Sequence, residues 1–233
     1  MGWARFRYHW GWMLSSLLLA CGGGGDRPAA AIPAKNIPAQ PDTRRTVLFV
    51  GTSITAGLGL DPAAAYPARI QAKVDSAGLP FRVINAGVSG ETSAGALRRI
   101  DWLLSQGPVG VLVIETGAND GLRGQSVDSL RANLNAIIVK AAAARPRPVV
   151  IVAGMEALPN LGRSYGGQFR ALFAEVAGQH GAYYLPFLLA DVAGVDSLNQ
   201  ADGIHPTPRG AMIVAGNVWR VLGPILDSIA KGT

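Results

Sequence analysis

The sequence predicts a single α/β domain in which a five-stranded parallel sheet lies between two layers of helices, a three-layer α/β/α sandwich. First, short β-branched runs alternate with longer segments of helical periodicity from residue 46 onward. Second, these runs are apolar throughout, which is typical of strands that are covered on both faces. Third, 233 residues with 49% apolar and 15% charged content suffice for one well-buried core and are few for two.

The predicted strands are short runs rich in Val, Ile, Leu, Phe and Tyr, at residues 46–50, 81–85, 109–115, 148–154 and 182–186. The predicted helices lie between and after them, at residues 64–77, 93–105, 126–144, 164–180 and 207–222, with an extension of the last helix past Gly223 and Pro224 to Ala230 left open. Glycine or proline follows most of these helices, and Pro208 lies in the first turn of the last one. Strand and helix alternate along the chain, and such a pattern predicts a parallel sheet with crossover helices.

The first twenty residues have the pattern of an export signal. Arg5 and Arg7 precede the apolar run "WMLSSLLLA", which is too short to cross a bilayer as a permanent helix. We therefore assign residues 1–20 to a lipoprotein-type signal peptide, residues 21–45 to a flexible tether rich in Gly, Pro and Ala, and residues 46–233 to the folded domain.

The only cysteine, Cys21, ends the segment "LLAC", which resembles the bacterial lipobox. The resemblance implies that Cys21 is lipidated and tethers the protein to a membrane, and a lone exported cysteine has no disulfide partner within the chain. Because Gly22 rather than aspartate follows the cysteine, the pattern indicates the outer membrane, on its periplasmic side or at the cell surface. The alternative is that Cys21 is a small residue at an ordinary cleavage site.

Charge and histidine content exclude two classes of function. The formal net charge is +6, and it falls to +4 without the two leader arginines; the remaining basic residues are spread along the chain rather than interleaved with aromatic residues. This pattern does not predict a nucleic-acid partner. Three histidines, one of them in the leader, do not form a metal site, so we expect neither metal nor other cofactor.

The unusual residues lie in the loops that follow the predicted strands. These loops read "GTSITAG" with Ser53, "NAGVSGET" with Gly90, "TGANDG" with Asn119 and "ADGIHPT" with Asp202 and His205. In an open α/β sheet the ligand site lies beyond the carboxyl ends of the strands. We therefore expect these five residues to converge at one edge of the sheet.

Their chemistry matches a nucleophile, a base and an acid. A serine hydroxyl becomes a good nucleophile when an imidazole takes its proton, and a carboxylate fixes the tautomer of that imidazole. His205 is the candidate base, because His9 lies in the leader and His180 ends a helix at the opposite edge of the sheet. Asp202 precedes His205 by three residues and can reach its Nδ1 atom, so Ser53, His205 and Asp202 form a candidate triad.

An acyl transfer also needs donors for the negative oxygen of its intermediate. The candidates are the backbone N–H groups of Ser53 and Gly90 and the side-chain amide of Asn119. Each has an ordinary alternative: Ser53 as a turn or N-cap residue, Gly90 as a left-handed turn position, and "ANDG" and "DGIHPT" as loop segments. Their order and shared edge favour the functional interpretation.

The four loop segments resemble the sequence blocks of the SGNH, or GDSL, hydrolases over nearly all of residues 46–225. The segments "ETGANDGLRG", "NAGVSGETSAG" and "ADGIHP" are most similar to the bacterial periplasmic thioesterase, lysophospholipase and arylesterase branch. The resemblance implies Ser53 as nucleophile, Gly90 and Asn119 as oxyanion donors, and Asp202 with His205 completing the triad. It also implies a flavodoxin-like strand order, 2-1-3-4-5, and no cofactor.

One residue departs from the family pattern. The first block is usually Gly-Asp-Ser, and here it is Gly51-Thr52-Ser53. Threonine keeps a hydroxyl that can bond neighbouring loop backbone, but it lacks the charge and the second acceptor of a carboxylate. Because the aspartate is not part of the triad, we expect activity to survive.

The loop "GMEALPNLG" offers an apolar lining for a substrate. Met155, Leu158, Pro159 and Leu161 would suit an acyl chain or an aryl group, and the alternative is that they pack the loop onto the sheet.

The sequence thus predicts a monomeric serine hydrolase that cleaves carboxylic esters or thioesters of small acyl or aryl groups through a covalent acyl-enzyme. A carbohydrate deacetylase and a non-catalytic surface binding module on the same scaffold are alternatives. The α/β-hydrolase fold is disfavoured, because "GTSITAG" lacks the G-x-S-x-G elbow and Asp202 lies only three residues from His205.

Overall fold

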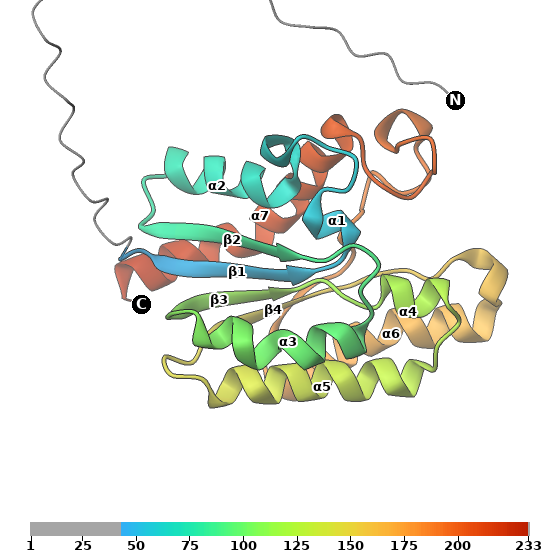
Figure 1. Cartoon of the computed structure of the whole chain (residues 1–233), viewed down its shortest axis with the longest axis horizontal. Helices are drawn as coiled ribbons and strands as arrows, with labels where there is room; N and C mark the ends of the chain where they lie inside the picture. The colour runs from blue at the N-terminus through green and yellow to red at the C-terminus, as the bar shows by residue number, and fades with distance from the viewer. Residues whose placement is uncertain (1–42, 233) are drawn as a thin grey trace, which may run out of the picture. The chain divides into compact units, whose positions relative to one another are not determined.

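The computed structural model describes residues 43–232, so the predicted signal peptide, Cys21 and nearly all of the predicted tether lie outside the described residues. Three layers build the domain (Figure 1). Helices α2 (Tyr66–Ser76) and α7 (Pro208–Lys231) cover one face of the central sheet. Helices α3 (Ser93–Ser105), α5 (Val127–Ala143) and α6 (Arg163–His180) cover the other.

The sheet holds five parallel strands in the order β2-β1-β3-β4-β5, which confirms the predicted architecture and the flavodoxin-like order. The strands are β1 (Arg45–Gly51), β2 (Phe81–Gly87), β3 (Val109–Ile114), β4 (Val149–Ala153) and β5 (Tyr183–Leu185). The short elements are α1 (Ser53–Ala56), α4 (Ala118–Leu122) and the 3₁₀ turns η1 (Pro62–Ala64), η2 (Pro159–Leu161) and η3 (Asp196–Leu198).

Both faces of the sheet are buried at the inner strands β1 and β3, which explains why these strands are apolar without alternation. Phe49 of β1 meets Tyr66 of α2 edge to face on one side, with ring centroids 5.5 Å apart. On the helix layer of the other side, Phe169 and Phe173 make a similar contact at 5.3 Å. All four side chains are at most 1% exposed, and such burial is the main stabilising contribution in a domain of this size.

The helices differ from the prediction at three places. The one-turn helices α1 and α4 were expected to be loops, because four or five residues are too few to show a helical period. Helix α2 begins at Tyr66 rather than at residue 64, after the separate turn η1 and with Pro67 in its first turn. Helix α7 takes the longer of the two predicted courses and continues through Pro224 to Lys231.

Helix α7 is apolar and long enough to span a bilayer by length and composition alone. Among the described residues it is the one helix that meets these criteria, but it packs against α2 and β5 as a covering helix of the sheet. Its N-cap is Thr207, whose hydroxyl accepts a hydrogen bond from the N–H of Gly210 at 3.3 Å.

The strand register brings the carboxyl ends of the strands to one edge. Gly51 pairs with Gly87 at the end of β1 and β2, and Val50 pairs with Ile114 of β3. The loops that carry the candidate residues therefore leave the sheet side by side, next to α1 and α4 (Figure 1). The start of β1 and the end of α7 both lie at the opposite edge (Figure 1).

Close packing of β2 against α1 gives a stability prediction. A Cβ atom at Gly87 would lie 2.2 Å from the backbone nitrogen of Ala56 and 2.8 Å from its Cα atom, whereas one at Gly110 of β3 would lie 3.4 Å from its nearest neighbour, the Cβ atom of Arg45. We expect Gly87→Ala to lower the free energy of unfolding by about 1–3 kcal/mol. The control Gly110→Ala should change it by less than about 0.5 kcal/mol. Urea denaturation measures both, and equal effects would contradict the packing argument.

Candidate active site

Ser53 opens the one-turn helix α1 directly after β1. The turn ends at Gly57, whose left-handed conformation (φ 77°) closes it, and the N–H of Gly57 bonds the carbonyl of Ser53 at 3.0 Å. Ser53 is 9% exposed and lies in the wall of a cavity, so its hydroxyl is sheltered from bulk water but accessible to a ligand.

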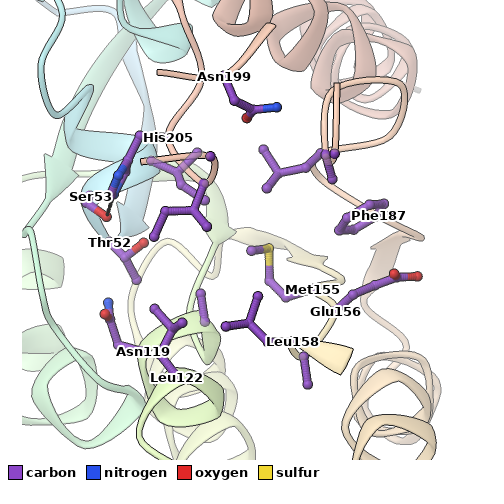
Figure 2. Close-up of a pocket in the computed structure, with 18 of the residues that line it drawn as sticks. Thr52, Ser53, Asn119, Leu122, Met155, Glu156, Leu158, Phe187, Asn199 and His205 are labelled. Atoms are coloured by element: carbon purple, nitrogen blue, oxygen red, sulfur yellow. Dashed lines mark hydrogen bonds between the residues drawn. The ribbon is translucent and has the colours of Figure 1, made fainter. Parts of the chain in front are cut away.

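His205 lies over this serine on the loop that follows β5 (Figure 2). Its Nε2 atom is 2.7 Å from Ser53 Oγ, and its Nδ1 atom is 2.6 Å from Asp202 Oδ2. A carboxylate only accepts hydrogen bonds, so Nδ1 carries the proton and Nε2 accepts the hydroxyl proton of Ser53. The structure thus places the three residues of the predicted triad in one hydrogen-bonded chain.

Asp202 is held by its own loop. Its second oxygen, Oδ1, accepts the backbone N–H groups of Ile204 and His205, both at 3.0 Å, and Gly203 takes the left-handed conformation (φ 76°) that this tight turn needs. The hydrogen bond from the His205 ring, followed by these two backbone bonds, lowers the pKa of Asp202 to about 2. The carboxylate therefore stays ionised at every pH at which the protein would work.

The loop of His205 is tied to the loop of Ser53 by Gln200. The side-chain amide of Gln200 donates to the carbonyl of Leu58 at 2.8 Å and to that of Pro206 at 3.0 Å. Its backbone N–H donates to the carbonyl of His205 at 2.7 Å. Since Leu58 follows α1 by two residues, a single glutamine fixes the base-bearing loop to the segment that carries the serine.

The predicted oxyanion donors Gly90 and Asn119 meet at the loop after β2, which contains Gly90 and accepts a hydrogen bond from Asn119. Asn119 on α4 donates one N–H of its amide to the carbonyl of Glu91 at 3.0 Å, which leaves its second N–H for another acceptor. Gly90 has φ 78°, and its carbonyl accepts a hydrogen bond from Arg123 at 2.9 Å. Asn119 lines the same cavity as Ser53, whereas Gly90 is not among the residues that line it.

Two further carboxylates hold this region, and sequence reasoning did not identify either. Asp120, 1% exposed, accepts the backbone N–H of Ser93 at 2.9 Å and its hydroxyl at 2.6 Å. Glu91 accepts three hydrogen bonds from the guanidinium group of Arg99, at 2.5 to 2.9 Å. Asp120 fixes the start of α3 from α4, the helix that carries Asn119, and Glu91 joins the loop of Gly90 to the middle of α3.

Thr52, the residue that departs from the family pattern, does not bond loop backbone as the sequence suggested. Its hydroxyl donates to the carboxylate of Glu115, 2.9 Å from Oε1 and 3.1 Å from Oε2, and its backbone N–H donates to Oε2 at 2.7 Å. The expected partner was wrong because Glu115 directly follows the apolar strand β3, and the sequence gives no signal that its side chain turns toward Thr52.

The cavity beside Ser53 has a volume of about 430 Å³ and a mainly apolar lining (Figure 2). Met155, Leu158 and Pro159 line it as the sequence suggested, and Leu161 is not among its lining residues. Sequence reasoning missed the apolar residues that other segments contribute to the cavity, which include Ile54, Leu122, Phe187, Leu189 and Ile204. Such a cavity fits an apolar group held next to the serine.

Within residues 43–232 no group of three or more His, Cys, Asp and Glu side chains is arranged to hold a metal ion.

Comparison with known proteins identifies the family. The sequence profile of the GDSL-like lipase/acylhydrolase family matches residues 49–213, which is well over half of the chain. The chain belongs to this family. Among relatives of this GDSL hydrolase, the esterase TesA of Pseudomonas aeruginosa is 40% identical over 187 residues, covering 80% of the chain and 92% of the relative. Thioesterase 1/protease 1/lysophospholipase L1 of Escherichia coli K12 is 32% identical over 182 residues, covering 78% of the chain and 85% of the relative.

Solved structures of similar enzymes agree with this fold. The crystal structure of TesA superimposes with a TM-score of 0.73 at 40% identity, covering 78% of the chain and 99% of TesA. The psychrotrophic esterase EstA from Pseudoalteromonas sp., in a structure inhibited by monoethylphosphonate, gives a TM-score of 0.74 at 33% identity, covering 78% of the GDSL hydrolase and 99% of EstA.

The lowered pKa of Asp202 predicts a pH-dependent contribution to stability. A depressed folded-state pKa stabilises the fold above the unfolded-state value of about 4, and this contribution disappears as the pH falls toward 2. Asp202→Asn should therefore be less stable than the wild type at pH 7 and 5, by a modest amount because the carboxylate is half exposed. The difference should shrink at pH 4 and 3. Urea denaturation at these four pH values tests this, and a pH-independent difference would contradict it.

Proposed function

We propose that this protein is a serine esterase that cleaves carboxylic esters and thioesters of acyl or aryl groups through a covalent acyl-enzyme. The observation that carries the proposal is the chain from Ser53 Oγ through His205 to Asp202, with distances of 2.7 and 2.6 Å, opening onto an apolar cavity. Membership of the acylhydrolase family and similarity to named esterases support it. The nucleophile, the base and the oxyanion donors are part of the proposal.

In the acylation step, Ser53 Oγ attacks the acyl carbon while His205 Nε2 accepts the hydroxyl proton. Asp202 stays ionised and stabilises the imidazolium that forms, because it accepts the Nδ1 proton at 2.6 Å. Collapse of the tetrahedral intermediate breaks the bond to the leaving alcohol or thiol. That leaving group takes the proton from His205, and the acyl group remains on Ser53.

The developing oxyanion would be stabilised by the backbone N–H groups of Ser53 and Gly90 and by the free amide N–H of Asn119. The hydrogen bond from Asn119 to the carbonyl of Glu91 supports this role, since it orients the amide without using both donors. In deacylation, water gives a proton to His205 and its oxygen attacks the acyl carbon. Ser53 then leaves with that proton, and a free carboxylic acid is the second product.

The lining of the cavity favours an apolar acyl or aryl group over a sugar. Its side chains, such as Met155, Leu158 and Phe187, offer dispersion contacts and few hydrogen bonds to a substrate that carries many hydroxyl groups. This argues against the carbohydrate deacetylase as the main function. A binding module without turnover is argued against by the complete hydrogen-bonded chain at Ser53, which a purely binding surface does not require.

The catalytic proposal is tested with p-nitrophenyl esters of graded acyl length. We expect Ser53→Ala and His205→Ala each to lower kcat by roughly 10³- to 10⁶-fold, because each removes a group that the acylation step needs. The exposed control Ser76→Ala should leave kcat unchanged. A fluorophosphonate probe should label the wild type and not Ser53→Ala. A folded wild-type protein that neither hydrolyses any ester nor reacts with the probe would favour the binding module.

We also propose that the protein is exported and anchored by a lipid on Cys21 to the bacterial outer membrane. The basic and apolar leader and the lipobox-like "LLAC" support this, together with Gly22 after the cysteine. We further expect the domain to be a monomer in solution.

The anchor is tested by expression of the full chain in a bacterial host. Wild-type protein should sediment with the membrane fraction and incorporate labelled palmitate, because an acylated Cys21 partitions into the bilayer. Cys21→Ser should lose the label and appear in the soluble periplasmic fraction. Membrane association and labelling that persist in Cys21→Ser would rule out this anchor.

A further inference from the structure

A buried carboxyl group lies directly beneath the serine loop, and the proposed acyl transfer does not use it. Glu115 follows the last residue of β3, and its side chain is 0% exposed. A carboxyl group is rarely placed in a dry core without a purpose, since it loses its hydration there and must find donors inside the protein.

Within residues 43–232, every hydrogen bond that the Glu115 carboxyl group accepts comes from the segment that carries Ser53. Thr52 donates its backbone N–H at 2.7 Å and its hydroxyl at 2.9 Å, and Thr55 donates its hydroxyl at 2.7 Å. These donors flank Ser53 on both sides in the sequence. The carboxyl group thus holds the residues on both sides of Ser53. The hydroxyl of Ser53 itself points to His205 (Figure 2).

The turn needs such support because a helix as short as α1 is not stable on its own. It has four residues, fewer than an isolated helix requires, and its N-cap residue Thr52 makes no side-chain capping bond. A threonine at that position ordinarily bonds a backbone N–H of the first turn. Here the hydroxyl is given to Glu115 instead, so the carboxyl group replaces the cap.

Close packing around the hydrogen-bonded group of Thr52, Thr55 and Glu115 restricts its rearrangement. A Cβ atom at Gly51 would lie 2.0 Å from Thr55 Oγ1 and 2.6 Å from Glu115 Oε2. Since the hydroxyl proton of Thr55 goes to Glu115, the buried Tyr66 donates to Thr55 at 2.8 Å. Asn85 of β2 donates to the backbone carbonyl of Thr55, also at 2.8 Å.

The groups around Glu115 act as hydrogen-bond donors to its carboxyl group. Burial raises the pKa of Glu115, and the hydrogen bonds from Thr52 and Thr55 oppose that shift in part. The backbone N–H of Thr52 can only donate, so the oxygen that it meets, Oε2, acts as an acceptor.

We propose that Glu115 is a positioning residue for the nucleophile: by accepting hydrogen bonds from Thr52 and Thr55 it keeps Ser53 Oγ within reach of His205. This inference rests on the proposed function. It assigns Thr52 a specific task, in which its hydroxyl links the turn to a carboxyl group of the neighbouring strand. Misplacement of a reacting atom by about 1 Å can cost on the order of 10²-fold in rate, so loss of this link should lower kcat while the cavity, and with it KM, changes little.

A pair of variants at Thr52 tests the link without emptying the core. Thr52→Val keeps the shape and removes the hydroxyl, and Thr52→Ser keeps the hydroxyl. We expect Thr52→Val to lower kcat by about 10- to 100-fold with KM within about twofold of the wild type. Thr52→Ser should retain at least about a third of kcat. The control Thr46→Val makes the same exchange at a 3% exposed threonine near the start of β1, remote from Ser53, and should change kcat by less than about twofold.

Glu115→Gln provides the second measurement. The carboxamide keeps the volume but turns an N–H₂ group toward donors of the turn, so kcat should fall at least as far as in Thr52→Val, again with KM preserved. Circular dichroism and thermal unfolding establish that each variant is folded. If Glu115→Gln does not fold, the Thr52 pair decides.

The outcomes separate this inference from the proposed function. Ester hydrolysis that depends on Ser53, with equal kcat in Thr52→Val and Thr52→Ser, would overturn the positioning role and leave the function intact. A raised KM with unchanged kcat in Thr52→Val would also overturn it. An equal fall of kcat in Thr46→Val would do the same. Hydrolysis that survives Ser53→Ala would refute the proposed function itself.

Discussion

The hydrogen bond between Ser53 and His205 is the contact on which the rest of the site depends. It joins residues 152 positions apart, one on helix α1 just after strand β1 and the other beyond the edge strand β5. A contact of 2.7 Å across such a separation requires that both loops be held in place. Gln200 fixes the loop of His205 to the carbonyl of Leu58, and the carboxyl group of Glu115 fixes the loop of Ser53 from below.

Carboxyl groups serve this site in two opposite ways. Asp202 lies in a half-exposed loop, where hydrogen bonds from His205 lower its pKa, so it is ionised and available to stabilise a positive imidazolium. Glu115 lies in the dry core, where burial raises its pKa, and its partners are neutral hydroxyl and amide groups. The first is suited to respond to charge during turnover, and the second is suited to hold geometry.

Much of the fold and the identity of the chemical groups could be predicted from the sequence, because both depend on local patterns. Apolar runs identify the strands, and the loops after them expose Ser53, Asn119 and His205 at one edge by topology alone. What depends on side-chain direction could not be predicted. Glu115 ends the segment "VGVLVIE" and gives no sign that it turns toward Thr52, and α1 and α4 are too short to show a period.

The two ends of the described chain lie at the edge of the sheet opposite to Ser53, where β1 starts and α7 stops (Figure 1). A fusion partner or a solid support attached at either end would therefore not obstruct the mouth of the cavity. Display on a bead or on another protein would leave the cavity facing solvent.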